Sequence, residues 1–307
     1  MQFFVEKDKN IRLANTEFMK KIFYTLLPFI FFACSLFSCQ SKTPPPQSSI
    51  IKIPNTPPDR LMEQPPSTIQ TPNEQTPAPT NIWNVDDVDV SYVSRERKLI
   101  SFTFDDSPST HLENLLSVFA DFNEKNPDCK ATATVFCNGY LFDNANAHTL
   151  HNACAMGWEL GNHSYSHPDM AKLSKEEALT EIEKTDKALQ AIDGKSTHLF
   201  RPPFGSISEI VKEVCPTPII NWTIDTLDWS GTSVEDIQTQ VLTQKYPGAI
   251  VLMHDHCPNT VDALKTLLPN LKEEGYQVVS VSALAKMHNC TLKRGSVYIR
   301  ARKKGNG

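Results

Sequence analysis

Seven short apolar runs lie between residues 98 and 284, and stretches with helical spacing separate them. The runs cover residues 98–106, 131–139, 158–164, 198–205, 219–226, 249–255 and 276–284. The clearest helical pattern covers 174–193, where Ser174 can cap the helix and Glu177, three residues later, completes a capping box. Strands that alternate with helices predict a parallel sheet with helices outside it, closed or nearly closed into a barrel. We therefore expect an α/β fold of the distorted (β/α)7-barrel type.

The N-terminal region has a different pattern. Residues 22–38 form an apolar run preceded by Lys20 and Lys21, as in a secretory signal. The run ends at Cys39, with Leu36 three residues before it, and this resembles the lipobox of bacterial lipoproteins, whose cysteine carries the lipid. An uncleaved anchor helix is the alternative. Residues 1–39 are thus expected to be a signal and lipid-attachment segment of an exported, membrane-anchored protein, in the periplasm or on the cell surface.

Composition separates the rest of the chain into three parts. The stretch 41–81 holds 11 of the 22 prolines, so we predict that residues 40–85 form an extended spacer without a core. Residues 86–290 are long enough for one domain with a sizeable core. Residues 291–307 are basic, and we expect them to be a solvated tail.

Polar residues follow the ends of the apolar runs. Asp105 and Asp106 end the first run, and His163 and His167 come directly after the third, four residues apart. That spacing predicts two imidazoles on one side of a helical turn. Two imidazoles and one carboxylate are a ligand set suited to zinc, with a position left for water or substrate. Three later runs also end in polar or charged groups, within "RPPFG" (201–205), "DTLDW" (225–229) and "VLMH" (251–254).

Together these stretches resemble the ordered motifs of the NodB-type polysaccharide deacetylases, carbohydrate esterase family 4. The five are "TFDDSP", "HSYSH", "RPPFG", "DTLDW" and "VLMH", and they occur in the family's order between residues 103 and 254. Two positions depart from the family pattern. Ser107 replaces a turn glycine, and Phe204 replaces the commoner tyrosine while keeping the backbone N–H that the family uses.

The resemblance implies a metal site and a base. Asp106, His163 and His167 would hold a divalent metal, with zinc expected and cobalt or others also compatible. The metal would activate a water molecule and polarise the acetyl carbonyl. Asp105 would be the general base, and Arg201 would orient it and keep it ionised.

The resemblance also implies an acid and a pocket. His254 would protonate the leaving amine, and a carboxylate would hold its ring, Asp228 by preference and Asp225 otherwise. The backbone N–H near Phe204 would stabilise the oxyanion. Trp229 and Leu252 would line the pocket for the acetyl methyl, although ordinary core packing also explains these two residues. Asp255 and His256 follow His254 and could support it from outside the site, but we favour a solvated loop for them.

These expectations favour a hydrolase that removes N-acetyl groups from an extracytoplasmic amino-sugar polymer. Peptidoglycan fits the predicted tether best, while chitin-like polymers and poly-N-acetylglucosamine stay open. The alternatives are hydrolysis of acetylated xylan or of small amides on the same fold, and a non-catalytic wall-binding module. The net charge of −5 argues against nucleic acid as a partner, and we expect a monomer. Six domain cysteines allow up to three disulfides, and we expect at least one.

Overall fold

The computed structural model describes residues 81–302, and strands and helices alternate along this part of the chain. The strands are β1 (Lys98–Ser107), β2 (Thr134–Cys137), β3 (Glu159–Asn162), β4 (Ile219–Ile220), β5 (Ile224–Asp225), β6 (Ile250–His254), β7 (Tyr276–Val279) and β8 (Val297–Tyr298). The α-helices are α2 (Leu112–Lys125), α3 (Asn144–Ala155), α4 (Lys175–Asp193), α5 (Glu209–Val214), α6 (Val234–Gln244), α7 (Pro258–Glu273) and α8 (Val281–Met287). Short 3-10 helices lie at η1 (Gly139–Leu141), η2 (Met170–Lys172), η3 (Pro203–Gly205) and η4 (Asp228–Ser230).

The strands form a parallel sheet with β1 at its centre. The strand order is β3-β2-β1-β6-β5, and β7 also pairs with β1. Phe200 forms isolated parallel bridges with Asn162 of β3 and with Ile219 of β4, which extend the strand pairing from β3 to β4. This confirms the predicted α/β fold with a parallel sheet, consistent with a NodB-like barrel.

The C-terminal segment belongs to this barrel. Strand β8 pairs with β4, and Arg300 forms a bridge with Ala249. Leu292 and Ala301 are each 1% exposed and pack in the core. The expectation of a solvated tail from residue 291 is therefore wrong within residues 291–302, because Leu292 and Ala301 are buried and β8 pairs with β4, although Val297 and Ile299 stay exposed.

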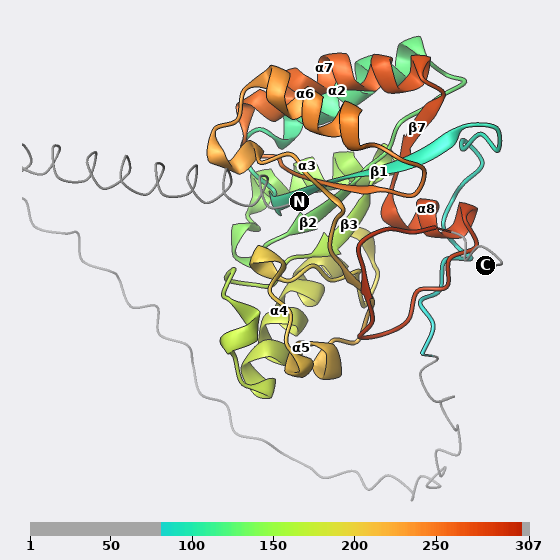
Figure 1. Ribbon diagram of the computed structural model, residues 1–307. Coiled ribbons are helices and arrows are strands. Elements are labelled where there is room, and N and C mark those ends of the chain that lie inside the picture. Colours follow the sequence, from blue (N-terminus) through green and yellow to red (C-terminus); the bar gives the residue numbers. More distant parts are fainter. Residues whose placement is uncertain (1–80, 303–307) are drawn as a thin grey trace, which may run out of the picture. The chain divides into compact units, whose positions relative to one another are not determined.

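Helices cover the sheet from outside. Figure 1 shows α2, α6 and α7 together on one side of the strands and α4 and α5 on the opposite side. The central strand β1 is buried along almost its whole length, as a strand covered by such helices must be. Helix α4 begins at the predicted cap, where Ser174 and Glu177 form the capping box.

Two predicted strands differ from the observed ones. The run 198–205 contributes only the bridges at Phe200, and the run 219–226 is split into β4 and β5. The expected disulfide is also absent from the described residues. All six domain cysteines are free thiols, and four of them are buried in the core, where cysteine packs as a small apolar side chain.

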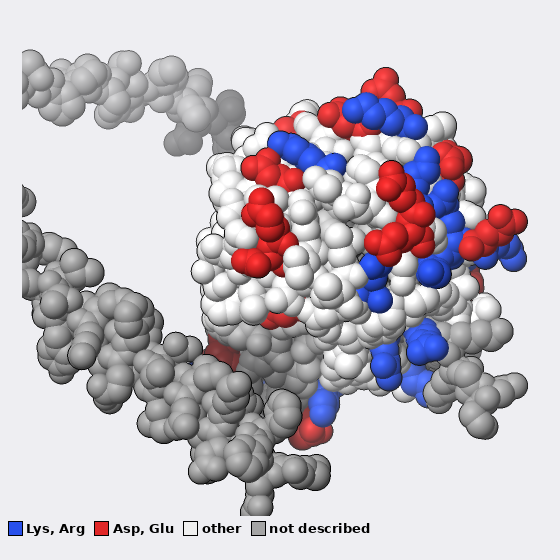
Figure 2. All heavy atoms as spheres, turned by 45° about the horizontal axis from the view of Figure 1, so that its top comes forward, with Lys and Arg blue, Asp and Glu red and all other residues white. Residues whose placement is uncertain are grey.

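The outer face carries charges of both signs. Figure 2 shows acidic and basic side chains interspersed on the side of the molecule that α2, α6 and α7 occupy in Figure 1. The face in view carries no uniform basic patch. Within residues 81–302 no helix is long and apolar enough to span a bilayer. Cys39, the predicted signal segment and nearly all of the spacer lie outside the described residues.

Candidate active site

The two adjacent carboxylates lie at the carboxyl end of β1. Asp105 is paired in register with His254 of β6, so the predicted base and the predicted acid come from neighbouring strands. Asp106 has φ of 59°, in the left-handed region. The β1–β2 register is irregular at the same point. Asp105 is 3% exposed, whereas the Asp106 side chain is 30% exposed. The two carboxylates therefore have different surroundings.

Asp106 lies beside both predicted histidine ligands. Its Oδ1 atom is 3.6 Å from His163 Nε2 and 3.2 Å from His167 Nε2. One ligand atom from each of the three residues lies within 4.8 Å of the others. Zinc ligands about 2.1 Å from the metal are about 3.4 Å apart in a tetrahedral site, so the spacing fits a divalent cation.

The state of His163 also fits a metal ligand. Its Nδ1 atom is 2.7 Å from the Arg201 carbonyl oxygen, which can only accept, so Nδ1 carries the proton and Nε2 keeps its lone pair. Burial lowers the pKa of His163, and the nearby carboxylates offset this only in part, which favours the neutral ring. Asp106 Oδ1 is a buried atom that accepts no hydrogen bond within the described residues. The lone pairs of His163 Nε2 and Asp106 Oδ1 are thus free and 3.6 Å apart, as two ligands of one cation would be.

Asp105 is held by a buried arginine. Arg201 donates from one terminal nitrogen to Asp105 Oδ1 at 2.6 Å and to Thr103 Oγ1 at 2.8 Å. Its Nε donates to the Ile220 carbonyl at 2.9 Å, and the guanidinium lies over the Phe136 ring. Burial lowers the pKa of Arg201, but a guanidinium stays charged at any physiological pH. The salt bridge holds the Asp105 carboxylate in one orientation.

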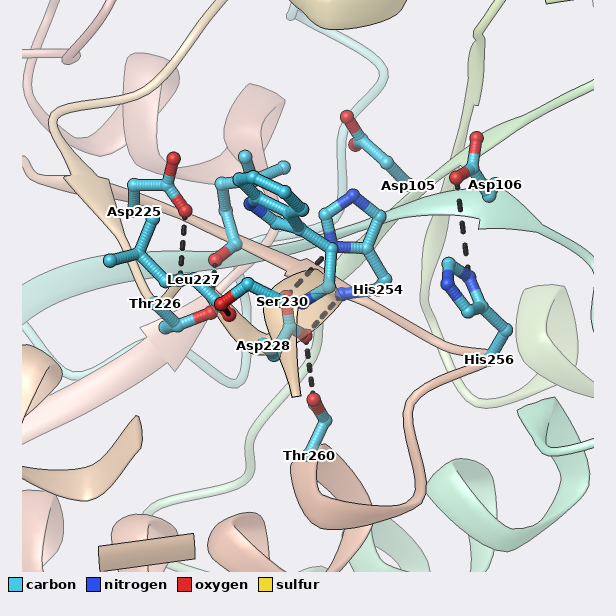
Figure 3. A network of polar contacts seen from close by, with 12 residues as sticks. Asp105, Asp106, Asp225, Thr226, Leu227, Asp228, Ser230, His254, His256 and Thr260 are labelled. Atoms are coloured by element: carbon cyan, nitrogen blue, oxygen red, sulfur yellow. Dashed lines mark hydrogen bonds and ion pairs between the residues drawn. The ribbon is translucent and has the colours of Figure 1, made fainter. Parts of the chain in front are cut away.

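His254 forms the opposite side of the site. Its Nδ1 is 2.8 Å from Asp228 Oδ1, and its backbone N–H donates to Asp228 Oδ2 at 2.7 Å. Thr260 donates to the same carboxylate at 2.6 Å (Figure 3). Asp225 instead accepts from the Leu227 N–H at 2.9 Å. Of the two predicted carboxylates, Asp228 is thus the one that contacts His254.

The surroundings of His254 favour its charged form. Burial alone would lower the pKa of His254, but the hydrogen bond and the charge of Asp228 outweigh it, with smaller contributions from Asp105 and Asp106. The pKa of His254 is therefore raised above its ordinary value. Because Nδ1 faces Asp228, the proton available for transfer is the one on Nε2.

The predicted pocket residues differ in exposure. Leu252 is 4% exposed, whereas Phe204 and Trp229 are 70% and 58% exposed. Phe204 has φ of 60°, and its ring packs edge-on against His167 with centroids 4.7 Å apart. An exposed aromatic ring beside a candidate metal ligand, as at Phe204, is suited to contact a sugar-sized substrate.

The His163–His167 segment is not helical, so the predicted helical turn is wrong. The two residues lie in an irregular loop after β3, and Ser164 and His167 have φ of 67° and 58°. The loop nevertheless brings both Nε2 atoms to Asp106, with the two rings 5.1 Å apart. Spacing of four residues suits a tight turn as well as a helix.

Sequence reasoning missed two residues that follow His254. Asp255 is fully buried and accepts from Ser107 Oγ and from the Ser109 N–H, each at 2.9 Å. Burial raises its pKa to about 7. His256 lies 4.0 Å from Asp106 and 5.4 Å from the His254 ring. The interpretation as a solvated loop is therefore wrong for Asp255, whereas the His256 side chain is 45% exposed. The Ser107 partner that would have indicated burial of Asp255 is 148 residues away in sequence.

The structure also accounts for serine in place of glycine at position 107. The positive φ falls on Asp106 and not on Ser107, so a side chain is accommodated without strain. Its hydroxyl instead joins the end of β1, which carries the two carboxylates, to Asp255.

A cavity of about 1210 Å³ lies away from this cluster and contains none of the predicted site residues. It is lined in part by Thr132, just before β2, and by Glu159, the first residue of β3. Chemistry in α/β barrels takes place at the opposite, carboxyl ends of the strands. We therefore locate the candidate active site at Asp105, Asp106 and the histidines.

Comparisons with known proteins point to one family. A family model described as polysaccharide deacetylase matches residues 92–215. A peptidoglycan-N-acetylglucosamine deacetylase of Bacillus cereus is 31% identical over 195 residues, which cover 60% of this chain and 67% of the relative. The chain belongs to the polysaccharide deacetylase family. The family assignment identifies a hydrolase domain for acetylated polysaccharides.

Solved structures of the same family share the fold. A peptidoglycan deacetylase of Bacillus subtilis is 31% identical, covers 64% of this chain and 94% of its own, and superposes with a TM-score of 0.59. An acetyl xylan esterase of Clostridium thermocellum, solved with a cobalt ion, is 26% identical and covers 66% of this chain and 98% of its own, with a TM-score of 0.60.

Some relatives are longer proteins. A peptidoglycan-N-acetylglucosamine deacetylase of Listeria monocytogenes is 33% identical over 192 residues, and this chain spans only 40% of its length. The likeness therefore concerns the deacetylase domain.

Proposed function

We propose that this protein is a metal-dependent hydrolase that removes N-acetyl groups from an extracytoplasmic amino-sugar polymer, with peptidoglycan as the favoured substrate. The observation that carries the proposal is the convergence at one end of the barrel of a cation site, a carboxylate fixed by arginine and a histidine fixed by aspartate. The peptidoglycan deacetylases among the relatives support the choice of substrate.

Asp106, His163 and His167 would hold the cation, zinc by preference and cobalt as an alternative. When bound, the cation supplies an acidified water molecule and polarises the acetyl carbonyl. The neutral state of His163 and the accepting atom of Asp106 support this assignment.

Asp105 accepts the proton of the attacking water. Its salt bridge to Arg201 fixes the direction of one oxygen, while Oδ2 lies on the side of His163, 3.6 Å from Nε2. The general base therefore lies beside the cation site, where the water must be deprotonated.

His254 donates its Nε2 proton to the departing amine nitrogen. An amine leaves poorly as an anion, so this proton is needed when the C–N bond breaks. Asp228 keeps the imidazolium charged and holds the ring in one orientation. The backbone N–H at Phe204 stabilises the negative charge that develops on the carbonyl oxygen, and the rings of Phe204 and Trp229 contact the sugar.

Acetate release from a panel of acetylated glycans tests the proposal. The panel contains peptidoglycan, chitin oligomers, poly-N-acetylglucosamine and acetylated xylan, each with and without a chelator and after zinc or cobalt is added back. We expect release of acetate with appearance of free amines on peptidoglycan, abolished by chelator and restored by metal.

Other results would overturn parts of the proposal. Release from acetylated xylan alone would make the protein an esterase. Cleavage of small amides without polymer activity would support the second enzymatic alternative. Binding of wall polymer without any acetate release would leave a wall-binding module.

A further inference from the structure

The loop between the two candidate histidine ligands has an uncommon backbone. Ser164 and His167 both adopt left-handed φ values, 67° and 58°, although neither is glycine. Such conformations cost free energy and persist only when surrounding contacts favour them. The loop therefore depends on groups outside it to keep both imidazoles beside Asp106.

Helix α4 supplies a carboxylate that fits this need. Glu181 Oε2 accepts the backbone N–H groups of Tyr165 and Ser166 at 2.9 Å and 2.7 Å. Its Oε1 accepts the Ser166 hydroxyl at 2.8 Å. Successive N–H groups that converge on one anion form a nest, and bonds to a charged acceptor are among the stronger hydrogen bonds in proteins.

The same helix holds the start of the loop. Asn162, the last residue of β3, donates to the Ile182 carbonyl and to Asp186 Oδ1 at 2.8 Å and 2.9 Å. Its own Oδ1 accepts the Ser164 N–H at 2.9 Å, and Ser164 Oγ accepts the His167 N–H at 3.1 Å. The loop is thus tied to one helix before and between its two histidines.

We infer that Glu181 is a positioning residue that sets the geometry of the His163–His167 ligand pair. Its three hydrogen bonds to the loop go to Tyr165 and Ser166, so it acts through the backbone that carries the rings. The inference rests on the proposed metal centre and adds to it a residue outside the five motifs. Without the carboxylate the left-handed turn loses its support, and the two Nε2 atoms are no longer held together for one cation.

Metal affinity of the purified apoprotein tests this inference. Zn²⁺ binding is measured by calorimetric titration for the wild type, Glu181→Gln and Glu183→Gln. Both variants remove one negative charge from α4, but Glu183 is exposed and makes no hydrogen bond to the loop within the described residues. We expect Glu181→Gln to bind Zn²⁺ about 10- to 100-fold more weakly, as changes in groups that orient metal ligands do, and Glu183→Gln to match the wild type.

Two further measurements separate positioning from general stability. The Co²⁺ absorption spectrum reports ligand geometry, and we expect it to change in Glu181→Gln and not in Glu183→Gln. A lower unfolding temperature of apo Glu181→Gln with unchanged Zn²⁺ affinity and Co²⁺ spectrum would make Glu181 only a structural residue and would overturn the inference. If Glu181→Gln does not fold, Ser166→Ala removes one bond of the set, and an affinity loss of about 2- to 10-fold is then expected. Wild-type affinity in that folded variant would count against the inference.

Asp106→Ala distinguishes the inference from the proposed function. If the wild type binds Zn²⁺, Asp106→Ala does not, and Glu181→Gln binds normally, the metal centre stands and the role of Glu181 is wrong. If the wild type binds neither Zn²⁺ nor Co²⁺, or if Asp106→Ala binds as well as the wild type, the proposed metal centre fails and the inference fails with it.

Discussion

At the scale of single residues, Asp105 and Asp106 are neighbours in sequence with different partners. Asp105 is buried against Arg201, and Asp106 faces two imidazoles. Changes in residues that only orient metal ligands usually weaken metal binding about 10- to 100-fold. Asp106 is a predicted ligand itself, so we predict that Asp106→Asn weakens Zn²⁺ binding by more than that. Asp105→Asn should keep Zn²⁺ and lose about 10²–10⁴-fold in turnover, as loss of a general base does.

Calorimetric titration and steady-state acetate release measure the two effects, with Asp121→Asn on the exposed face of α2 as a charge-matched control. Equal Zn²⁺ affinity in both site variants, or near-normal turnover of Asp105→Asn, would show that the division of roles is wrong.

The His254–Asp228 pair predicts a pH effect. His254 must be protonated to donate, so activity falls as the pH rises through its pKa, which Asp228 raises above the ordinary value of about 6.5. Asp228→Asn removes the negative charge and should lower the pKa of His254, which moves the alkaline limb of kcat to lower pH. Turnover measured from pH 5 to 10 checks this. An unmoved limb in a folded Asp228→Asn would mean that His254 does not set it.

The residue scale also shows what sequence could and could not predict. The structure brings together the predicted ligand atoms and forms the Arg201–Asp105 and His254–Asp228 contacts. This was predictable because the motifs lie at the carboxyl ends of extended segments, and these ends meet at one edge of a parallel sheet. Asp255 and Glu181 were missed. The partners of Asp255 are distant in sequence, and Glu181 resembles any other acidic residue of an exposed helix face.

At the scale of elements, long and strongly patterned segments were predictable and short ones were not. Strand β1 and helix α4 match their predicted positions because ten or more residues carry the pattern and α4 has a capping box. Strands β4 and β5 have two residues each, too few to show a period. The left-handed turns at Ser164 and His167 depend on contacts with α4 that local spacing does not contain.

Strand β8 gives a prediction at this scale. Ending the chain after Cys290 removes Leu292, Ala301 and the pairing with β4. Burying one leucine contributes about 1.5–3 kcal/mol, so the unfolding temperature should fall by at least about 3 °C. Ending the chain after Arg302 is the matched control and should leave it unchanged. Thermal unfolding followed by circular dichroism measures both, and equal midpoints would mean that β8 adds nothing to stability.

At the scale of the whole molecule, the chain combines a deacetylase domain with an N-terminal region of separate character. From the sequence alone we propose that the apolar run 22–38 directs export and leads to the anchor, and that the proline-rich stretch after it is a spacer. A tether of this kind limits the reach of the domain to polymers near the membrane. This is the physical reason to favour peptidoglycan over a freely diffusing substrate.

The anchor is testable through Cys39. Leu36 and Ser38 precede it as in a lipobox, so we predict that a labelled fatty acid enters the wild type and is absent from Cys39→Ser. Cys34→Ser is the matched control, because Cys34 lies within the apolar run that cleavage before Cys39 would remove. Cys34→Ser should be labelled like the wild type and should fractionate with membranes. A protein held by lipid needs more than one covalent chain for stable anchoring. Cys39→Ser would carry none, so it should shift to the soluble fraction if its signal is still cleaved. Equal labelling of Cys39→Ser and the wild type would rule out Cys39 as the site of lipid attachment.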